Sequence, residues 1–312
     1  MAPKIGYLLP TRERIMLGEP DAAALLALAE RAESLGYDSI WAGDSLLARP
    51  RHEPLTLLAG VAGRTRNVEL GTAILLPALR NAVLLAHQVA TVDQVSGGRL
   101  ILGVGIARDV PNIRAEFASA GVPFDKRVGR LLEELRLCRA LWTGEPVDWD
   151  GRWTVEGGVL APTPHRPGGP PIWMGGDVPL ALKRAGRYYD GWFPTGPDAE
   201  GWKAKFAEVK GYAQEAGRDP EAVIGAIYLT LEIDDDVARA EQRLDAYLEE
   251  YYGQPAAGLK QREFCYAGPA AGAAEWIAGY VEAGVSHVVL RMAGDPVRNL
   301  ERMADVRAQI GG

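Results

Sequence analysis

Val-Glu-Leu-Gly-Thr-Ala-Ile-Leu-Leu-Pro (68–77), a helical run from about Asn81 to Val95, Gly-Gly-Arg (97–99) and Leu-Ile-Leu-Gly-Val-Gly (100–105) follow one another in this 312-residue chain. Two short apolar runs separated by one helix are typical of a parallel β-α-β unit. Parallel strands are covered on both faces and need a helical crossover, which explains the pattern. The stretch therefore predicts an α/β protein.

The same rhythm continues on both sides of this stretch. Strands are predicted at 4–9, 37–42, 68–75, 100–105, 171–176, 190–194, 222–233 and 286–291. Helices are predicted at 22–35, 55–64, 81–95, 179–187, 198–216, 237–252, 270–283 and 297–309. Eight strand-helix repeats without a composition break or a linker predict one domain, residues 1–312, with a closed (β/α)8 TIM barrel fold.

Two segments depart from the rhythm and are predicted to be insertions after strands four and seven. The first follows residue 105 and contains a short helix at 113–120, an amphipathic helix at 126–142 and a hairpin at 146–159 around a two-residue Asp150-Gly151 turn. The second covers 253–264.

Composition excludes several classes of protein. The formal net charge of -7, without a basic stripe, argues against nucleic-acid binding. Two cysteines support no disulfide framework. The N-terminus lacks the pattern of a signal peptide, and no apolar run approaches the ~18 residues of a membrane span. We expect a cytoplasmic protein that is not in a membrane.

In a (β/α)8 barrel the active groups lie at the C-terminal ends of the strands. Asp44 follows the second strand, and Gly175-Gly176 comes just before a helix, where unpaired backbone N–H groups can bind an anion. Tight turns and a loop cap are the structural alternatives for these residues. Asp44 is the leading candidate for a catalytic residue.

Six segments, in order along almost the whole chain, resemble the bacterial luciferase-like monooxygenase superfamily. They are Gly36-Tyr37-Asp38-Ser39-Ile40-Trp41-Ala42-Gly43-Asp44, Leu70-Gly71-Thr72, Gly97-Gly98-Arg99-Leu100-Ile101-Leu102-Gly103-Val104-Gly105, Leu141-Trp142-Thr143-Gly144-Glu145-Pro146, Pro171-Ile172-Trp173-Met174-Gly175-Gly176 and Asp190-Gly191-Trp192.

The resemblance implies a (β/α)8 oxidoreductase that uses the deazaflavin coenzyme F420 or, alternatively, FMN. It implies that the cofactor ring lies across the strand ends, with its phosphate near the fifth strand. It also implies a cis peptide bond between Ala73 and Ile74 and a homodimer. The implied cofactor-binding residues are Asp44, Thr72, Ala73, Ile74, Gly105, Ile106, Gly175, Gly176 and Asp177.

The sequence departs from the family pattern at two positions. Ser45 stands where several F420 enzymes have a histidine after the acid of strand two. Asp177 follows the two glycines, where a carboxylate directed at a phosphate would repel it. We expect either that Asp177 turns outward or that the cofactor anion lies elsewhere.

Four further residues are candidate substrate contacts: Trp41, His52, Arg108 and Trp192. Core packing is the alternative for the two tryptophans, and an ion pair with Asp109 is the alternative for Arg108. No histidine pair has the spacing of metal ligands, so no metal is expected.

Three functions remain open from the sequence. The first is F420-dependent hydride transfer to or from a small organic substrate. The second is an FMNH2-dependent monooxygenase that uses oxygen and a separate flavin reductase. The third is a non-catalytic flavin-binding barrel.

Overall fold

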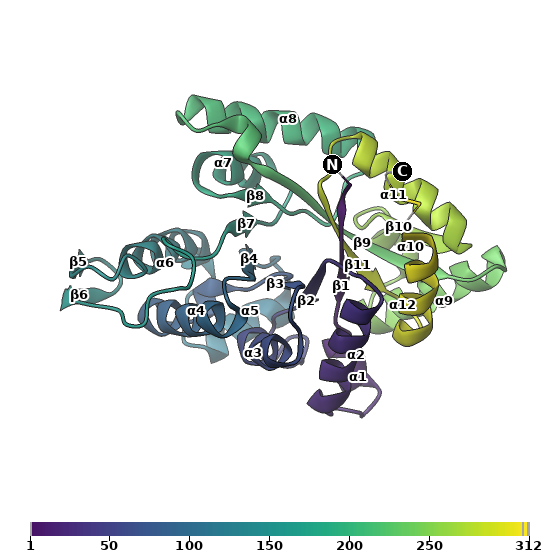
Figure 1. The fold of residues 1–312 in the computed structure, drawn as a ribbon, viewed down its shortest axis with the longest axis horizontal. Coiled ribbons are helices and arrows are strands. Elements are labelled where there is room, and N and C mark those ends of the chain that lie inside the picture. Colours follow the sequence, from purple (N-terminus) through teal and green to yellow (C-terminus); the bar gives the residue numbers. More distant parts are fainter. Residues whose placement is uncertain (1, 308, 311–312) are drawn as a thin grey trace. The chain divides into compact units, whose positions relative to one another are not determined.

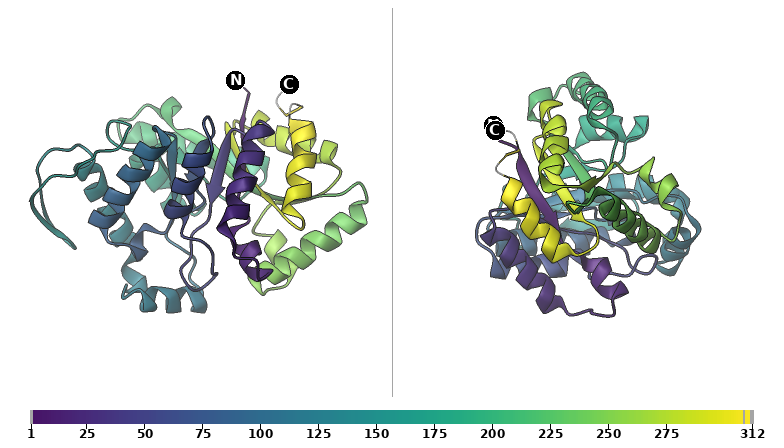
Figure 2. Two further views of the ribbon diagram at one scale, coloured as in Figure 1. Left: turned by 60° about the horizontal axis from the view of Figure 1, so that its bottom comes forward. Right: turned by 90° about the vertical axis from the view of Figure 1, so that its right-hand side faces the viewer.

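The computed structural model describes residues 2–307 and 309–310 and is shown in Figures 1 and 2. The chain divides into two compact units, each described by itself. The larger unit comprises Met1–Trp41 and Ile172–Gly312, and the smaller unit comprises Ala42–Pro171.

The larger unit is built on a parallel sheet. Its strands are β1 (Lys4–Leu8), β2 (Ser39–Ala42, whose last residue begins the smaller unit), β7 (Ile172–Met174), β8 (Gly191–Trp192), β9 (Ile224–Ile233), β10 (Cys265–Gly268) and β11 (His287–Met292). Strand pairs join them in the order β7-β8-β9-β11-β1-β2. The ten-residue β9 pairs with two strands on one side. Its first residues, Ile224 and Gly225, pair with β8, and its last residues, Thr230 to Ile233, pair with β10.

Helices connect these strands in the larger unit. They are α1 (Thr11–Met16), α2 (Ala22–Ser34), α7 (Pro179–Tyr188), α8 (Ala199–Glu215), η3 (Pro220–Ala222), α9 (Val237–Tyr252), α10 (Ala256–Lys260), α11 (Ala270–Glu282) and α12 (Pro296–Arg307). Asp21, Asp198 and Asp236 cap α2, α8 and α9, because each carboxylate accepts a hydrogen bond from a first-turn N–H. An ion pair between Arg31 and Glu301 joins α2 to α12, which lie side by side in Figure 2.

The smaller unit contains the stretch that predicted the fold class. Its elements are α3 (Pro54–Arg64), β3 (Glu69–Thr72), η1 (Pro77–Leu79), α4 (Ala82–Ser96), β4 (Leu100–Val104), α5 (Pro111–Ser119), η2 (Phe124–Lys126), α6 (Arg127–Leu141), β5 (Val147–Asp150) and β6 (Thr154–Gly158). Parallel β3 and β4 align Leu70 with Leu100, and the antiparallel pair of β5 and β6 lies at the end of α6 (Figure 1).

Aromatic side chains fill the core of the larger unit. Trp41, Trp173, Phe193 and His287 pack with ring centroids 5.1 to 6.0 Å apart. Trp41 Nε1 donates to Ser39 Oγ at 2.7 Å, and Ser39 Oγ lies 2.7 Å from His287 Nε2. Burial lowers the pKa of His287 to about 3, so this ring is neutral. His287 is therefore a core residue.

Eight strand-helix repeats follow one another along the chain, and the predicted (β/α)8 fold is confirmed. All eight predicted strands are present, as are both insertions. The prediction of a single domain is not tested by this structure and stays a prediction.

Three local predictions were wrong. Thr11–Met16 forms α1 although the segment up to Pro20 was expected to be a loop, and β10 was not expected. Asp150 and Gly151 were expected to form a two-residue turn, but Asp150 pairs with Thr154, so the hairpin has a three-residue loop, residues 151–153. The last predicted helix, 297–309, includes residue 308, which lies outside the described residues.

Among residues 2–307 and 309–310, none of the helices has the length and apolar character needed to span a bilayer.

Candidate cofactor site

Asp44 follows β2 and is held by groups that follow β3. Its side chain is 2% exposed. Arg80 binds it with two nitrogens, Nη1 to Oδ2 at 2.6 Å and Nη2 to Oδ1 at 3.1 Å. The backbone N–H of Leu76 donates to Oδ2 at 2.8 Å. This bidentate pairing fixes the carboxylate in one orientation and joins the two strand ends.

Arg80 is itself anchored on several sides. Its Nη2 also contacts Glu53 Oε1 at 2.9 Å, and its carbonyl accepts from Arg130 Nη2 at 2.9 Å. Burial alone would lower the pKa of Arg80, but the ion pairs with Asp44 and Glu53 outweigh burial and raise it. The cation is therefore a fixed part of the structure.

The ends of β3 and β4 form a closely packed backbone surface. The Ala73–Ile74 peptide bond is cis, as the resemblance implied. The Ala73 N–H donates to the Ala42 carbonyl at 2.8 Å, and the Gly105 N–H donates to the Leu75 carbonyl at 3.0 Å. A Cβ atom at Gly105 would overlap Ile74 Cδ1, so a side chain at this position would require the end of the Ile74 side chain to move.

Two side chains fix the backbone on either side of that surface. Thr72 Oγ1 donates to the Gly103 carbonyl at 2.8 Å, which ties β3 to β4. Arg127 Nε donates to the Ile106 carbonyl at 2.8 Å, and the Arg127 guanidinium lies 3.7 Å from the centroid of the Phe124 ring. The insertion after β4 thus holds the predicted cofactor contact at Ile106 in place.

Ser45, which replaces the family histidine, is fully engaged in the loop after β2. Its hydroxyl donates to Glu116 Oε1 at 2.7 Å, and its oxygen accepts from the Arg49 N–H at 2.9 Å. The same Glu116 oxygen accepts the backbone N–H groups of residues 46 to 48. Glu116 is 1% exposed and comes from α5. Ser45 therefore orders its loop through Glu116.

In the larger unit, Gly175 and Gly176 follow β7 and precede α7. Gly176 has a φ of +95°, a conformation that side chains other than that of glycine rarely adopt. Its carbonyl accepts from Trp192 Nε1 at 2.8 Å, so the turn is fixed in place. Within the part of the chain that the structure describes, the backbone N–H groups of Gly176, Asp177 and Val178 have no hydrogen-bond acceptor.

Asp177 turns away from these N–H groups. Its Oδ2 lies 3.1 Å from Lys205 Nζ on α8, and Lys205 also donates to the Asp177 carbonyl at 3.1 Å. One of the two arrangements expected from the sequence was an outward orientation in which Asp177 caps the following helix; the carboxylate pairs with Lys205 instead, and α7 has no side-chain cap hydrogen bond. An anion at the turn would face backbone donors and not the carboxylate.

The structure places the four predicted substrate contacts differently. Trp41 and Trp192 are both 0% exposed: Trp41 lies in the aromatic core, and Trp192 stacks on Trp202 and Phe206. His52 is partly buried in the loop before α3, and Arg108 is exposed. Asp109 pairs with Arg114 at 2.6 Å. Substrate contact by these four residues stays a prediction, and the contacts of both tryptophans are those of packing residues.

Sequence reasoning missed Arg80, Glu116 and Arg127. Each contacts a predicted site residue or its neighbour from 21 to 71 positions away, and none lies in a short motif. In the sequence, these three residues could be recognised only as charged residues near a helix boundary or in the insertion after a strand. Many charged residues share that position, so it does not single out these three.

Comparisons with known proteins show which family this chain resembles. A family model described as luciferase-like monooxygenase matches residues 3–312. The F420-dependent glucose-6-phosphate dehydrogenase of Mycolicibacterium smegmatis is 31% identical over 303 residues, which cover 88% of this chain and 89% of that protein. The 5,10-methylenetetrahydromethanopterin reductase of Methanolobus tindarius is 32% identical over 213 residues, or 68% of this chain and 62% of that relative's length.

Solved structures share the fold over the whole chain. An F420-dependent secondary alcohol dehydrogenase in complex with an F420-acetone adduct has a TM-score of 0.85 at 22% identity, with 100% of both chains covered. Monooxygenases are also among the similar solved structures.

Proposed function

This chain belongs to the luciferase-like monooxygenase family and is an F420- or flavin-dependent oxidoreductase, and we propose that it uses F420 to exchange hydride with a small organic substrate. The observation that carries the proposal is the 31% identity to an F420-dependent dehydrogenase over 88% of the chain. The non-catalytic alternative lacks such support, because the similar proteins named above are enzymes.

Two backbone surfaces, each described within its own unit, support the proposal. In the smaller unit, Ala73, Ile74 and Gly105 carry no polar side-chain atoms, and we propose that their backbone contacts the aromatic ring. In the larger unit, the unpaired N–H groups after Gly175 suit a phosphate, because α7 directs the positive end of its dipole toward that turn. When bound, F420 supplies a carbon that accepts or donates hydride.

The outward orientation of Asp177 supports this fit. Its ion pair with Lys205 removes the repulsion that the sequence suggested, so the turn can hold an anion. We propose that Gly176, Asp177 and Val178 bind the cofactor phosphate through their backbone N–H groups.

We propose a positioning role for Asp44. Its two oxygens accept hydrogen bonds from Arg80 and from the Leu76 N–H, so the carboxylate fixes the segment that follows Ile74. Direct catalysis by Asp44 stays a prediction.

A parallel titration with F420 and FMN tests the cofactor. We expect F420 to bind saturably and FMN to bind weakly or not at all, followed by reduction or oxidation of F420 when a substrate is added. Saturable FMN binding without F420 binding would instead support the FMNH2-dependent monooxygenase, for which the solved monooxygenases of this fold are the supporting observation.

Three further predictions stay open: a homodimer, a separate flavin or F420 reductase as partner, and a cytoplasmic location. Analytical ultracentrifugation tests the first of them directly.

A further inference from the structure

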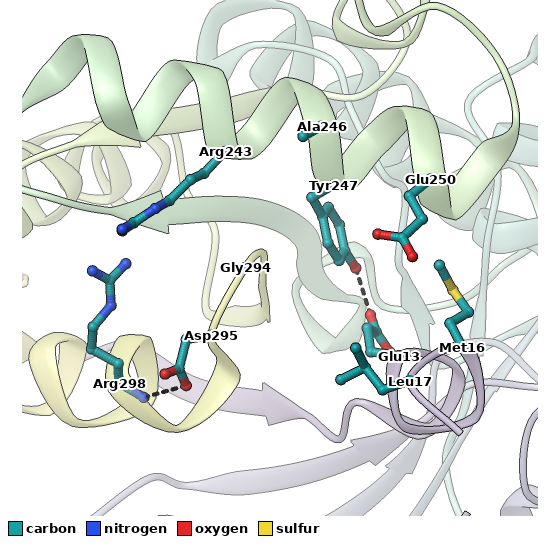
Figure 3. A pocket seen from close by; sticks show the side chains of 10 residues that line it. All are labelled: Glu13, Met16, Leu17, Arg243, Ala246, Tyr247, Glu250, Gly294, Asp295 and Arg298. Carbon is teal, nitrogen blue, oxygen red and sulfur yellow. Dashed lines mark hydrogen bonds between the residues drawn. The ribbon is translucent and has the colours of Figure 1, made fainter. Parts of the chain in front are cut away.

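A cavity of about 510 Å³ lies in the larger unit, and none of its lining residues is among those assigned to the cofactor. It lies between α1, α9 and the start of α12, which follow β1, β9 and β11 (Figure 3). Those three strands are neighbours in the sheet. This cavity, called here the α1–α9 cavity, is lined by Glu13, Met16, Leu17, Arg243, Ala246, Tyr247, Glu250, Gly294, Asp295 and Arg298.

The arginines of the cavity already have protein partners. Arg243 Nη1 lies 2.8 Å from Asp234 Oδ2, and Arg298 Nη1 lies 3.3 Å from the same oxygen. Arg298 Nη2 also binds Glu232 Oε1 at 2.5 Å. Asp234 pairs in addition with Arg239. These two buried carboxylates offset most of the guanidinium charge, so the arginine end does not require an anionic ligand.

The opposite end presents carboxylates without a cation. In Figure 3 the side chains of Glu13, from α1, and Glu250, from α9, point toward each other beside Met16. The Tyr247 hydroxyl donates to Glu13 Oε1 at 2.5 Å, which fixes that carboxylate. Among residues 2–307 and 309–310, neither glutamate forms an ion pair. Two negative charges therefore face the cavity unneutralised.

A third polar group lies close to this end. Tyr7 on β1 is 0% exposed, and its hydroxyl has no hydrogen-bond partner among the residues that the structure describes. Its electrostatic neighbours include Glu13 and Asp295, which both line the cavity. Burial raises the pKa of Tyr7 well above its usual value, so the hydroxyl stays neutral. Tyr7 is not among the residues that line the cavity.

The remaining wall is apolar. Met16, Leu17 and Ala246 contribute aliphatic or thioether surface, and Leu17 is 67% exposed at the cavity. A cavity of this volume is within the usual range for small organic ligands. Within the described ranges, no three side chains among His, Cys, Asp and Glu are arranged to hold a metal ion. Two carboxylates next to an apolar wall fit an organic cation better than an inorganic one.

We propose that the α1–α9 cavity is a second small-molecule site, which binds a primary ammonium group attached to an aromatic or alkyl body. Glu13 and Glu250 hold the ammonium group, and Met16, Leu17 and Ala246 contact the apolar body. Its lining shares no residue with those proposed to bind the cofactor.

Calorimetric titration with benzylamine tests this proposal, with benzyl alcohol and benzoate as the neutral and anionic probes of similar shape. We expect saturable binding of benzylamine that weakens as salt is added, and little or no binding of the other two probes. Equal binding of benzyl alcohol and benzylamine would show that the carboxylates do not select the ligand, and absence of benzylamine binding would overturn the proposal outright.

Two glutamate variants test whether benzylamine binds in the α1–α9 cavity. Glu13→Gln keeps an acceptor for Tyr247, and Glu250→Gln changes an exposed residue, so both variants are expected to fold. Each should weaken benzylamine about tenfold, the loss expected when one charge-assisted hydrogen bond is removed. Glu241→Gln is the matched control, because residue 241 lies nine positions before Glu250 on α9 and so projects from the opposite face.

A parallel titration with F420 separates this proposal from the proposed function. F420 binding should be the same in the wild type, Glu13→Gln and Glu250→Gln. Loss of F420 binding with retained benzylamine binding would contradict the cofactor proposal alone. Benzylamine binding that is unchanged in both glutamine variants would place the probe elsewhere and contradict the α1–α9 cavity.

Discussion

Ile74 fills the space that a side chain at position 105 would need. The Ile74 Cδ1 atom lies 2.1 Å from the position of a Cβ atom on Gly105, and Ile74 Cγ1 lies 3.2 Å from it. Glycine at 105 and isoleucine at 74 are therefore matched in volume across β3 and β4, at the surface proposed to support the cofactor ring.

Gly105→Ala should lower the free energy of unfolding by about 1–3 kcal/mol, the usual cost of overpacking, and should weaken F420 binding. Urea unfolding and F420 titration measure the two effects. In the double variant with Ile74→Val, which lacks Cδ1, much of the stability should return. Gly63→Ala is the control, because nothing lies within 4 Å of an added Cβ there and alanine favours the α3 helix. If Gly105→Ala behaves like Gly63→Ala, the packing argument is wrong.

Removing one partner of the Asp44–Arg80 pair should lower the free energy of unfolding by about 3 kcal/mol, because the other side chain is left as an unpaired buried charge. The side chain of Asp44 is 2% exposed and that of Arg80 is 12% exposed. We expect Asp44→Ala and Arg80→Ala each to show this loss, and the double variant to lose clearly less than the sum. Chemical denaturation of the four proteins gives the coupling energy. Additive losses would show that the two side chains act separately. F420 titration of Asp44→Asn, whose side chain keeps the acceptor for Leu76, then measures the effect of the charge on binding.

We predict that Glu134 makes the folded protein less stable as the pH rises. It lies on α6, is 0% exposed, and neither of its oxygens has a hydrogen-bond partner among the described residues. Burial raises its pKa to about 9 despite the nearby Arg130 and Arg80. The pKa of Glu134 is higher in the folded protein than in the unfolded chain. The contribution of Glu134 to the free energy of unfolding is therefore complete below about pH 4.5 and is lost as the pH rises toward 9.

The slope from this one group is about 1.4 kcal/mol per pH unit at most. Glu134→Gln should remove it, so the variant should be the more stable protein at pH 8, and the difference should shrink toward pH 5. Urea unfolding at several pH values measures the slope. Glu145→Gln, at an exposed position of the smaller unit, should keep the wild-type slope. Parallel pH curves for wild type and Glu134→Gln would mean that Glu134 is charged in the folded protein.

Lys205 should influence cofactor binding through Asp177. With Lys205→Ala, the Asp177 carboxylate loses its ion pair and can approach the turn, so F420 should bind several-fold more weakly at low salt. Asp177→Ser should bind F420 as tightly as the wild type or more tightly, and the double variant should resemble Asp177→Ser. Fluorescence titrations in low and high salt test these relations. A weaker F420 complex in Asp177→Ser would show that the carboxylate assists binding.

Much of the architecture follows from local sequence patterns. The strand at Val68 to Leu75 and the strand at Leu100 to Gly105 are apolar runs of strand length, and the helix between them begins at Asn81, whose side chain accepts from the first N–H groups. Such features depend on residues a few positions apart. The α1 helix escaped prediction because Thr11–Met16 is short and polar, and β10 escaped because its first three residues are only partly buried, which gives a weak pattern.

The sequence by itself determined the (β/α)8 fold, the family and the strand ends at which a cofactor is expected, because repeat order, helix caps and glycine positions are local properties. Only the tertiary structure decided what each side chain does there. It paired Asp44 with Arg80, Ser45 with Glu116 and Asp177 with Lys205, across 28 to 71 positions. Such contacts depend on which charged groups the folded backbone brings within hydrogen-bonding distance, and no local pattern records that distance.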